Sequence, residues 1–164
     1  MTHRHDWHGW RVGFVICGAL CLAAAGAARA DENSPFIGHW RWDRALSKLP
    51  PGEPAPTDMA LDFERVDAVH VRWTVTVKDA QGRPSLESHD TPGNGEFYPI
   101  SEDTTASFRM LAPDRLQASF KGPEGETDSM TCTVAPDRRK MTCEGAKSAG
   151  GGKAVSYVDV YDRE

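Results

Sequence analysis

The stretch VHVRWTVTVK, residues 69–78, alternates apolar and polar side chains without interruption. One face carries four valines and Trp73, and the other carries His70, Arg72 and Lys78 together with two threonines. Successive side chains of a β-strand point to opposite faces, so this period of two predicts a half-buried strand over residues 69–78. The pattern recurs in stripes formed by Met59, Leu61 and Phe63, by Phe108 and Met110, by Leu116, Ala118 and Phe120, and by Val158 and Val160.

These stripes indicate the fold class. Turn-forming residues separate them at 79–82, 92–95, 112–114, 122–125 and 150–152, so we expect about ten short strands. Strands that are neighbours in sequence tend to pair as hairpins, and a closed meander has no open edge. The sequence therefore predicts an all-β chain that forms an antiparallel up-and-down β-barrel of about 8–10 short strands.

Residues 43–56 do not follow the alternating pattern. Asp43 can cap a single helical turn that ends near Leu46, and prolines then dominate residues 50–56. A proline-rich segment can bind an aromatic groove of another protein or form an extended loop of its own domain. We favour the loop, and expect it to cross one mouth of the barrel.

The first thirty residues have the features of a cleavable signal peptide. Arg4 and Arg11 supply a positive start, residues 12–28 are apolar or small, and Ala28-Arg29-Ala30 forms an A-x-A cleavage site. Cleavage after Ala30 would leave one domain, residues 31–164, in the periplasm or outside the cell. The alternative is an uncleaved signal anchor, which would still place the domain outside the cytoplasm.

The charge balance argues against two classes of partner. Residues 1–30 contain three of the 19 basic and one of the 24 acidic residues, so the mature chain has a formal charge of −7. An acidic surface repels nucleic-acid phosphates and anionic lipid. We therefore expect no nucleic-acid partner. We also expect no stable membrane span once the signal peptide is removed, because the polar residues 31–35 have no stop-transfer character.

Two cysteines remain in the mature chain, Cys132 and Cys143. Strand-like sequences surround both, and residues 136–139 between them resemble a four-residue turn. In that register Cys132 falls directly opposite Cys143, on a close pair suited to a disulfide. We predict a structural disulfide that faces the core and contributes about 2 kcal/mol, because the loop it closes is short. A redox-active pair is the alternative, but the C-x-x-C spacing is missing.

The tripeptide Gly38-His39-Trp40 carries the G-x-W pattern with which lipocalin-like barrels begin. It is followed by Trp42-Asp43, Ser47-Lys48, the prolines of residues 51–56, GEFYPI at 95–100 and VDVYD at 158–162. Together these resemble a group of small exported bacterial lipocalin-like proteins, most of which have no assigned function. The resemblance covers nearly all of the mature chain and implies an up-and-down barrel, but it supplies no catalytic residues. Asp43 stands where the group has asparagine, and the cysteine pair is not part of the group's pattern.

No constellation in the sequence supports a reaction or a cofactor. A nucleotide fingerprint, zinc-ligand spacing and a nucleophile elbow are all missing. His39, His70 and His89 are far apart in sequence, and the strand pattern turns His39 and His70 toward solvent. Adjacent residues of a strand point to opposite faces, so Ser88-His89-Asp90 cannot form a triad. We therefore expect a protein without enzymatic activity, cofactor or metal.

Aromatic residues are the candidate binding residues, namely Trp73, Phe63, Phe108, Trp40 and Trp42. All are predicted to face inward, where a barrel of eight or more strands can hold a small hydrophobic ligand. The alternative is that these rings fill the core, and for Trp40 we favour a plug at one end of the barrel. Two functions follow: an exported protein that binds a small apolar ligand, or an envelope interaction module with a solid barrel. In the second, Tyr157 and Tyr161 would contact another protein.

Overall fold

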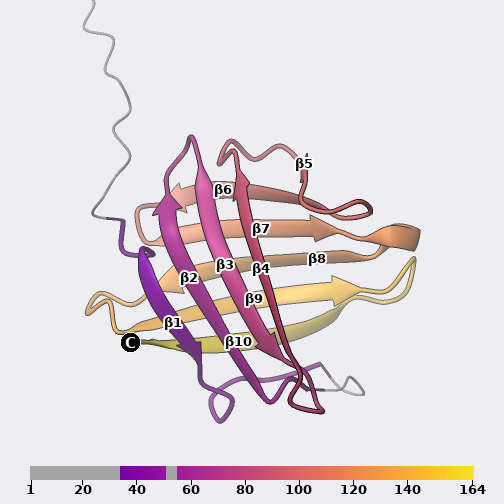
Figure 1. Cartoon of the computed structure of the whole chain (residues 1–164). Coiled ribbons are helices and arrows are strands. Elements are labelled where there is room, and N and C mark those ends of the chain that lie inside the picture. The colour runs from indigo at the N-terminus through magenta and orange to yellow at the C-terminus, as the bar shows by residue number, and fades with distance from the viewer. Residues whose placement is uncertain (1–33, 51–54) are drawn as a thin grey trace, which may run out of the picture.

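The computed structural model describes residues 34–50 and 55–164, which form ten antiparallel strands (Figure 1). Within these ranges, no helix has the length and apolar character needed to cross a membrane. The strands are β1 (Gly38–Trp42), β2 (Asp58–Val66), β3 (Val71–Lys78), β4 (Pro84–Thr91), β5 (Tyr98–Pro99), β6 (Thr105–Ala112), β7 (Arg115–Lys121), β8 (Thr127–Val134), β9 (Lys140–Ser148) and β10 (Val155–Arg163).

All ten strands belong to one sheet, in the order β4-β3-β2-β1-β10-β9-β8-β7-β6-β5. Strands adjacent in sequence pair with each other except β4 and β5, and β1 pairs with β10, where Trp40 lies opposite Arg163. The sheet curls so that β1–β4 cross β6–β10 as a second layer (Figure 1). The predicted up-and-down barrel is confirmed. Its closure is incomplete, because β4 and β5 are edge strands that face each other across a gap, which we call the seam.

Trp40 closes one end of the barrel. Its side chain is fully buried, and its Nε1 donates a hydrogen bond to the carbonyl oxygen of Phe36 at 2.7 Å. The Arg163 guanidinium lies 4.2 Å from the Trp40 ring centroid and donates to the carbonyl oxygen of Ile37 at 2.6 Å. Gly38, at φ 132°, is needed beneath this guanidinium, since a Cβ there would lie 2.5 Å from its Nη1. The glycine and tryptophan of the G-x-W pattern therefore build one plug.

The strand predicted over residues 69–78 begins two residues later than expected. Val69 is 44% exposed and belongs to the turn between β2 and β3. The Asp67 carboxylate accepts hydrogen bonds from the backbone N–H groups of Val69 and His70, both at 2.7 Å. These bonds hold a tight turn, so the pairing of β3 with β2 begins only at Val71.

The apolar stripe predicted for the last strand was assigned to the wrong face. Tyr157, Asp159 and Tyr161 of β10 point into the barrel, whereas Val158 and Val160 point away from it. Val160 is nevertheless buried, outside the core cluster and beside the chain that follows β1. The backbone of both valines bonds to residues 43–48, and the inner face of β10 is the more polar one.

The β8–β9 hairpin has the predicted register. Val134 pairs with Met141, and Cys132 lies opposite Cys143. A disulfide joins these two cysteines, and both are buried at the core, 5% and 1% exposed. The bridge therefore ties two neighbouring strands of the inner wall together.

Removing this disulfide is expected to lower the free energy of unfolding by about 2 kcal/mol, because a short loop in the unfolded chain is no longer closed. The measurement is urea denaturation of the oxidised protein and of the double variant Cys132→Ala/Cys143→Ala. Equal denaturation midpoints would contradict the expectation, provided that the urea dependence is unchanged.

Asp43 caps a turn after β1, as expected. Its Oδ1 accepts from the N–H groups of Ala45 and Leu46 at 3.0 and 3.1 Å, and the segment forms a turn with no regular helix. Part of the proline-rich segment, residues 51–54, and the whole predicted signal peptide, residues 1–30, lie outside the described residues. The flanking Pro50 and Pro56 line the interior of the barrel.

Candidate functional site

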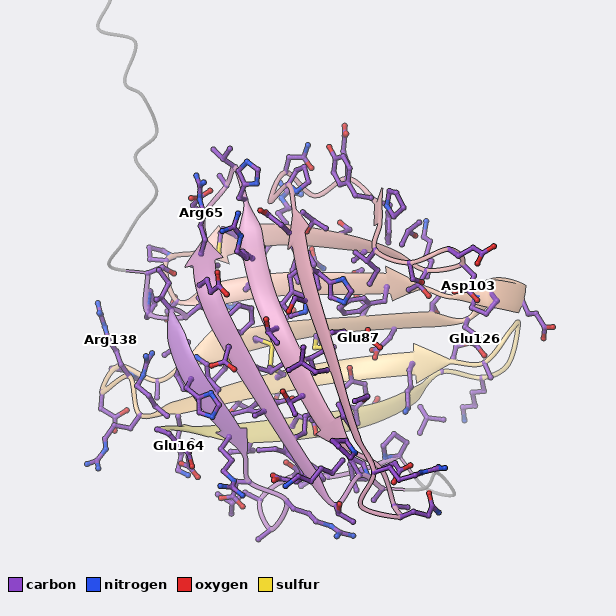
Figure 2. All side chains as sticks on the ribbon, in the orientation of Figure 1. Arg65, Glu87, Asp103, Glu126, Arg138 and Glu164 are labelled. Carbon is purple, nitrogen blue, oxygen red and sulfur yellow. A yellow bond between two sulfur atoms is a disulfide. The ribbon has the colours of Figure 1, made fainter. Side chains whose placement is uncertain are left out.

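The two layers enclose a cavity of about 520 Å³. Its walls are mainly apolar and come from strands of both layers, and Leu49, Pro50 and Pro56 line it from the segment between β1 and β2. The barrel interior is thus not filled by its own side chains, which argues against the solid-core alternative. Figure 2 shows charged side chains such as Asp103 and Glu126 at the end of the molecule away from Arg138 and Glu164.

Aromatic rings form the central part of the wall. The centroids of Trp73 and Phe108 are 4.4 Å apart, and Phe120 meets Phe108 edge-on at 5.8 Å. The imidazole of His89 lies 4.9 Å from the Trp73 ring, so a polar group borders this apolar surface. These rings hold one another in place, and they present an apolar surface to the cavity.

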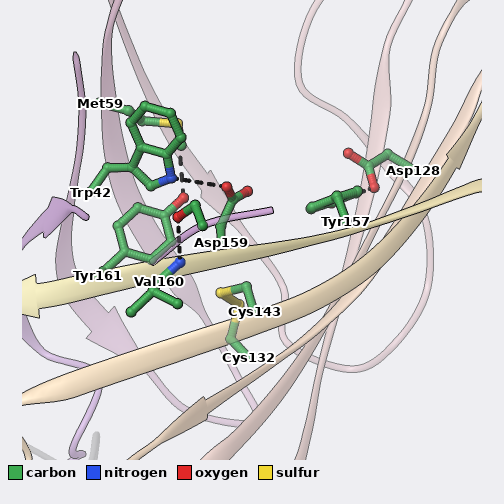
Figure 3. The surroundings of a disulfide bond; sticks show 10 residues. Trp42, Met59, Asp128, Cys132, Cys143, Tyr157, Asp159, Val160 and Tyr161 are labelled. Carbon is green, nitrogen blue, oxygen red and sulfur yellow. Dashed lines mark hydrogen bonds between the residues drawn. A yellow bond between two sulfur atoms is a disulfide. The ribbon is translucent and has the colours of Figure 1, made fainter. Parts of the chain in front are cut away.

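A second group of cavity residues, which we call the polar end, comprises Trp42, Asp128, Tyr157, Asp159 and Tyr161 (Figure 3). The Trp42 Nε1 donates to the Asp159 carboxylate at 2.9 Å, and the Tyr157 hydroxyl donates to that of Asp128 at 2.6 Å. The Tyr161 hydroxyl points to the Met59 sulfur at 3.8 Å. Hydrogen-bonding groups therefore face the cavity from β1, β8 and β10.

Gly145 on β9 makes room for Tyr157, which lies opposite it in the ladder. A Cβ at Gly145 would come within 2.5 Å of the Tyr157 ring, so any larger residue would push the ring away. The glycine therefore lets the phenol lie flat against the barrel wall and reach Asp128.

Burial raises the pKa values of three groups at the polar end. Burial raises the pKa of the Asp159 carboxyl, and the nearby charge of Asp128 adds to the rise, while the Trp42 hydrogen bond and Lys147 oppose it. Burial also raises the pKa values of Tyr157 and Tyr161, and nearby carboxylates add to both shifts. Both phenols are therefore neutral, and a charged Asp159 costs the folded state free energy.

Asp159→Asn is expected to raise the melting temperature at pH 7. Since burial raises the pKa of Asp159 in the folded state, its ionisation destabilises the fold above that pKa, and this penalty disappears as protonation becomes complete. The variant and the wild type should therefore converge toward about pH 3, below the pKa of an unperturbed aspartate. Thermal unfolding across this pH range checks the trend. A variant that melts lower than the wild type at pH 7, or a difference that grows on acidification, would contradict it.

The structure brings four of the five predicted aromatic residues to the cavity. Trp42, Phe63, Trp73 and Phe108 line it. Trp40 does not line the cavity, because its side chain is buried in the plug, which is the interpretation that the sequence analysis favours for it.

Several cavity residues were missed or misplaced by the sequence analysis. Tyr157 and Tyr161 are only 7% and 4% exposed and face inward, so neither can serve as the outer contact that was considered for them. Asp159, Asp128 and His89 were not proposed as site residues. The alternating pattern contained a signal for β10, since its aromatic residues occupy one face, but the valines of the other face obscured it.

The seam provides a second hollow, of about 560 Å³. It lies between β4 and the segment from β5 to β6, and it shares part of its lining with the main cavity. No ladder closes the barrel here, and the two hollows adjoin along the seam. The shared lining residues are Glu87, His89, Ile100 and Thr104.

The other two histidines of the described residues lie away from the cavity. His39 Nδ1 is 2.5 Å from Asp62, and His70 Nδ1 is 3.0 Å from Asp90, with both imidazoles about two-fifths exposed. In the described part of the chain, no three His, Cys, Asp or Glu side chains come together as a metal site. These two histidines form surface ion pairs when protonated.

No family model matches the chain, and no curated protein matches it. Among solved structures, a redesigned β-barrel aligns with a TM-score of 0.51 at 11% identity, over 80% of this chain and 93% of that chain. The wild-type fluorescent protein UnaG aligns with a TM-score of 0.50 at 15% identity, over 79% of this chain and 97% of its own. At such low sequence identity, these similarities show only the fold. Topology and comparison agree that this chain is a lipocalin-like, antiparallel up-and-down β-barrel.

Proposed function

We propose that this protein is an exported, non-enzymatic binding protein that carries a small, mainly apolar ligand inside its barrel. The observation that carries the proposal is the cavity of about 520 Å³ between the two layers. Cavities of about 300–1,000 Å³ with apolar walls and a few placed polar groups are typical small-molecule sites. The signal-like residues 1–30 support export, and a disulfide is the expected state of paired cysteines outside the cytoplasm.

The chemistry of the cavity supports binding over catalysis. The two tyrosine hydroxyls are held neutral by burial, which raises their pKa values and makes them poor nucleophiles. The Asp159 and Asp128 carboxylates already accept hydrogen bonds from Trp42 and Tyr157. These pairs orient polar atoms toward a guest without presenting an activated nucleophile next to a base.

Mass spectrometry tests the proposal directly. The full chain is expressed with export to an oxidising compartment, and the purified protein is weighed under native and then denaturing conditions. We expect an additional mass of a few hundred daltons, the size class such a cavity holds, that disappears on denaturation. The same protein, freed of ligand, should bind decan-1-ol with one-to-one stoichiometry in calorimetry. A ligand-free native mass together with no binding of decan-1-ol or of its charged analogues would overturn the proposal.

A further inference from the structure

We propose that the cavity selects an amphipathic cation, a molecule with an apolar body and a protonated amine at the end that meets Asp159. This inference rests on the proposed ligand-binding function and specifies the chemical class of the ligand. The shape of the cavity accommodates the body, and the polar end recognises the amine.

The hydrogen bonds of the polar end leave mainly acceptors for a guest. The indole N–H of Trp42 is already donated to Asp159, and the hydroxyl of Tyr157 to Asp128. Tyr161, which is only 4% exposed, directs its hydroxyl hydrogen at the Met59 sulfur, a weak acceptor. Its oxygen lone pairs remain to accept from a guest. A guest that supplies N–H donors therefore fits this end, whereas a guest carboxylate would meet acceptors.

The charges of the lining point the same way. Three carboxylates line the cavity, those of Glu87, Asp128 and Asp159, and Lys147 is the one lysine or arginine among the described lining residues. Lys147 is engaged within the wall, directly opposite Asp128 in the β8–β9 ladder. Its three carboxylates and one lysine give the lining a formal charge of −2, histidine not counted. A guest cation therefore offsets the net negative charge of the lining.

Two neighbouring hollows do not offset the negative charge of the cavity lining. The hollow beyond Lys147, about 490 Å³, adds one acid and one base, Glu126 and Lys153. The seam adds a further carboxylate, Asp103. A cation in either hollow therefore meets a neutral or negative lining, and an anion is disfavoured in the hollow at the seam.

Because it is partly buried, Asp159 is the carboxylate of the lining that would interact most strongly with a guest ammonium group. It is half-buried, whereas the side chain of Glu87 is 65% exposed. Burial and the charge of Asp128 raise the pKa of Asp159, so its charged form is disfavoured in the folded protein. An ammonium group bound next to it would stabilise that charged form in a poorly screened environment.

The test compares three probes of equal chain length: decylammonium, decan-1-ol and decanoate. Their dissociation constants are measured by calorimetry at pH 7 with the wild type, Asp159→Asn and Asp162→Asn. The amide introduced by Asp159→Asn retains an oxygen that can accept from Trp42, so the variant removes the charge and keeps the shape. Asp162→Asn is the matched control, because Asp162 lies on the same strand, is 48% exposed, and bonds to Lys140 on the outside.

We expect the wild type to bind decylammonium about tenfold or more tightly than decanoate, which corresponds to about 1.4 kcal/mol or more. Asp159→Asn should weaken decylammonium binding by about tenfold and weaken decan-1-ol binding by a smaller factor, because the alcohol carries no charge. Asp162→Asn should change neither. Retained decan-1-ol binding also shows that the variants are folded.

Three results would overturn the proposal, and they separate its failure from that of the binding function. If decan-1-ol binds but decylammonium binds no better than decanoate, the cavity binds ligands without this charge selection. If Asp162→Asn weakens decylammonium as much as Asp159→Asn does, the preference arises from the overall acidity of the protein. If none of the probes binds and the native mass is ligand-free, the proposed function fails as well.

Discussion

Replacing Trp40 with alanine is expected to lower the free energy of unfolding by about 3–5 kcal/mol, the usual cost of deleting a buried aromatic side chain. The indole is fully buried, its N–H is bonded to the Phe36 carbonyl, and the Arg163 guanidinium lies over its ring. The variant loses all of these contacts and leaves the end of the barrel unfilled. Urea denaturation at equilibrium measures the loss.

Trp40→Phe is the matched control. It retains an aromatic ring beneath Arg163 but lacks the N–H, so it should lose about 1–3 kcal/mol and stay folded. Because Trp40 does not line the cavity, Trp40→Phe should bind decan-1-ol as the wild type does. An alanine variant within about 1 kcal/mol of the wild type would show that the plug contributes little to stability.

Filling the cavity from both layers is expected to weaken decan-1-ol binding by more than about tenfold, since the ligand would have to displace packed side chains. Val75 on β3 and Met130 on β8 both line the cavity. The double variant Val75→Trp/Met130→Trp places two indoles in the space that the proposed ligand occupies. Calorimetry is the suitable measurement, because the added tryptophans alter the intrinsic fluorescence.

The control places the same two indoles on the outer face. Thr76 and Thr131 follow these residues on the same strands, so their side chains point away from the cavity. Thr76→Trp/Thr131→Trp should bind decan-1-ol as tightly as the wild type. Equal affinity in both double variants would mean that decan-1-ol binds somewhere other than the barrel interior.

The sequence predicts those parts of the fold whose inner face is apolar. Trp73 and Val75 face inward because burying apolar surface selects one of the two strand faces. Likewise, a four-residue turn and two cysteines suffice to set the register of the β8–β9 hairpin. In both cases the side chains that determine the pattern are also those that pack in the core.

The same reasoning fails where the inner wall is polar. β4 reads PSLESHDT and shows no apolar stripe, although its His89 and Glu87 line the cavity. On β10, Asp159 faces inward and Val160 outward, so the apolar pattern predicts the reverse of the observed orientation. A binding site requires polar groups inside, and such groups remove the very contrast that identifies an inner face. The polar end therefore becomes visible only once the strands are placed in space.

The pairing of β1 with β10 also constrains when the barrel can form. Hairpins such as β2–β3 and β8–β9 can assemble as soon as their own residues are available, but β1 finds its second neighbour only at residues 161–163. A chain synthesised from its N-terminus thus keeps Trp40 without its Arg163 cover until all ten strands have been made. Completion of the barrel is therefore a late event in synthesis, and a chain that stopped before residue 161 would lack the pairing that joins its two halves.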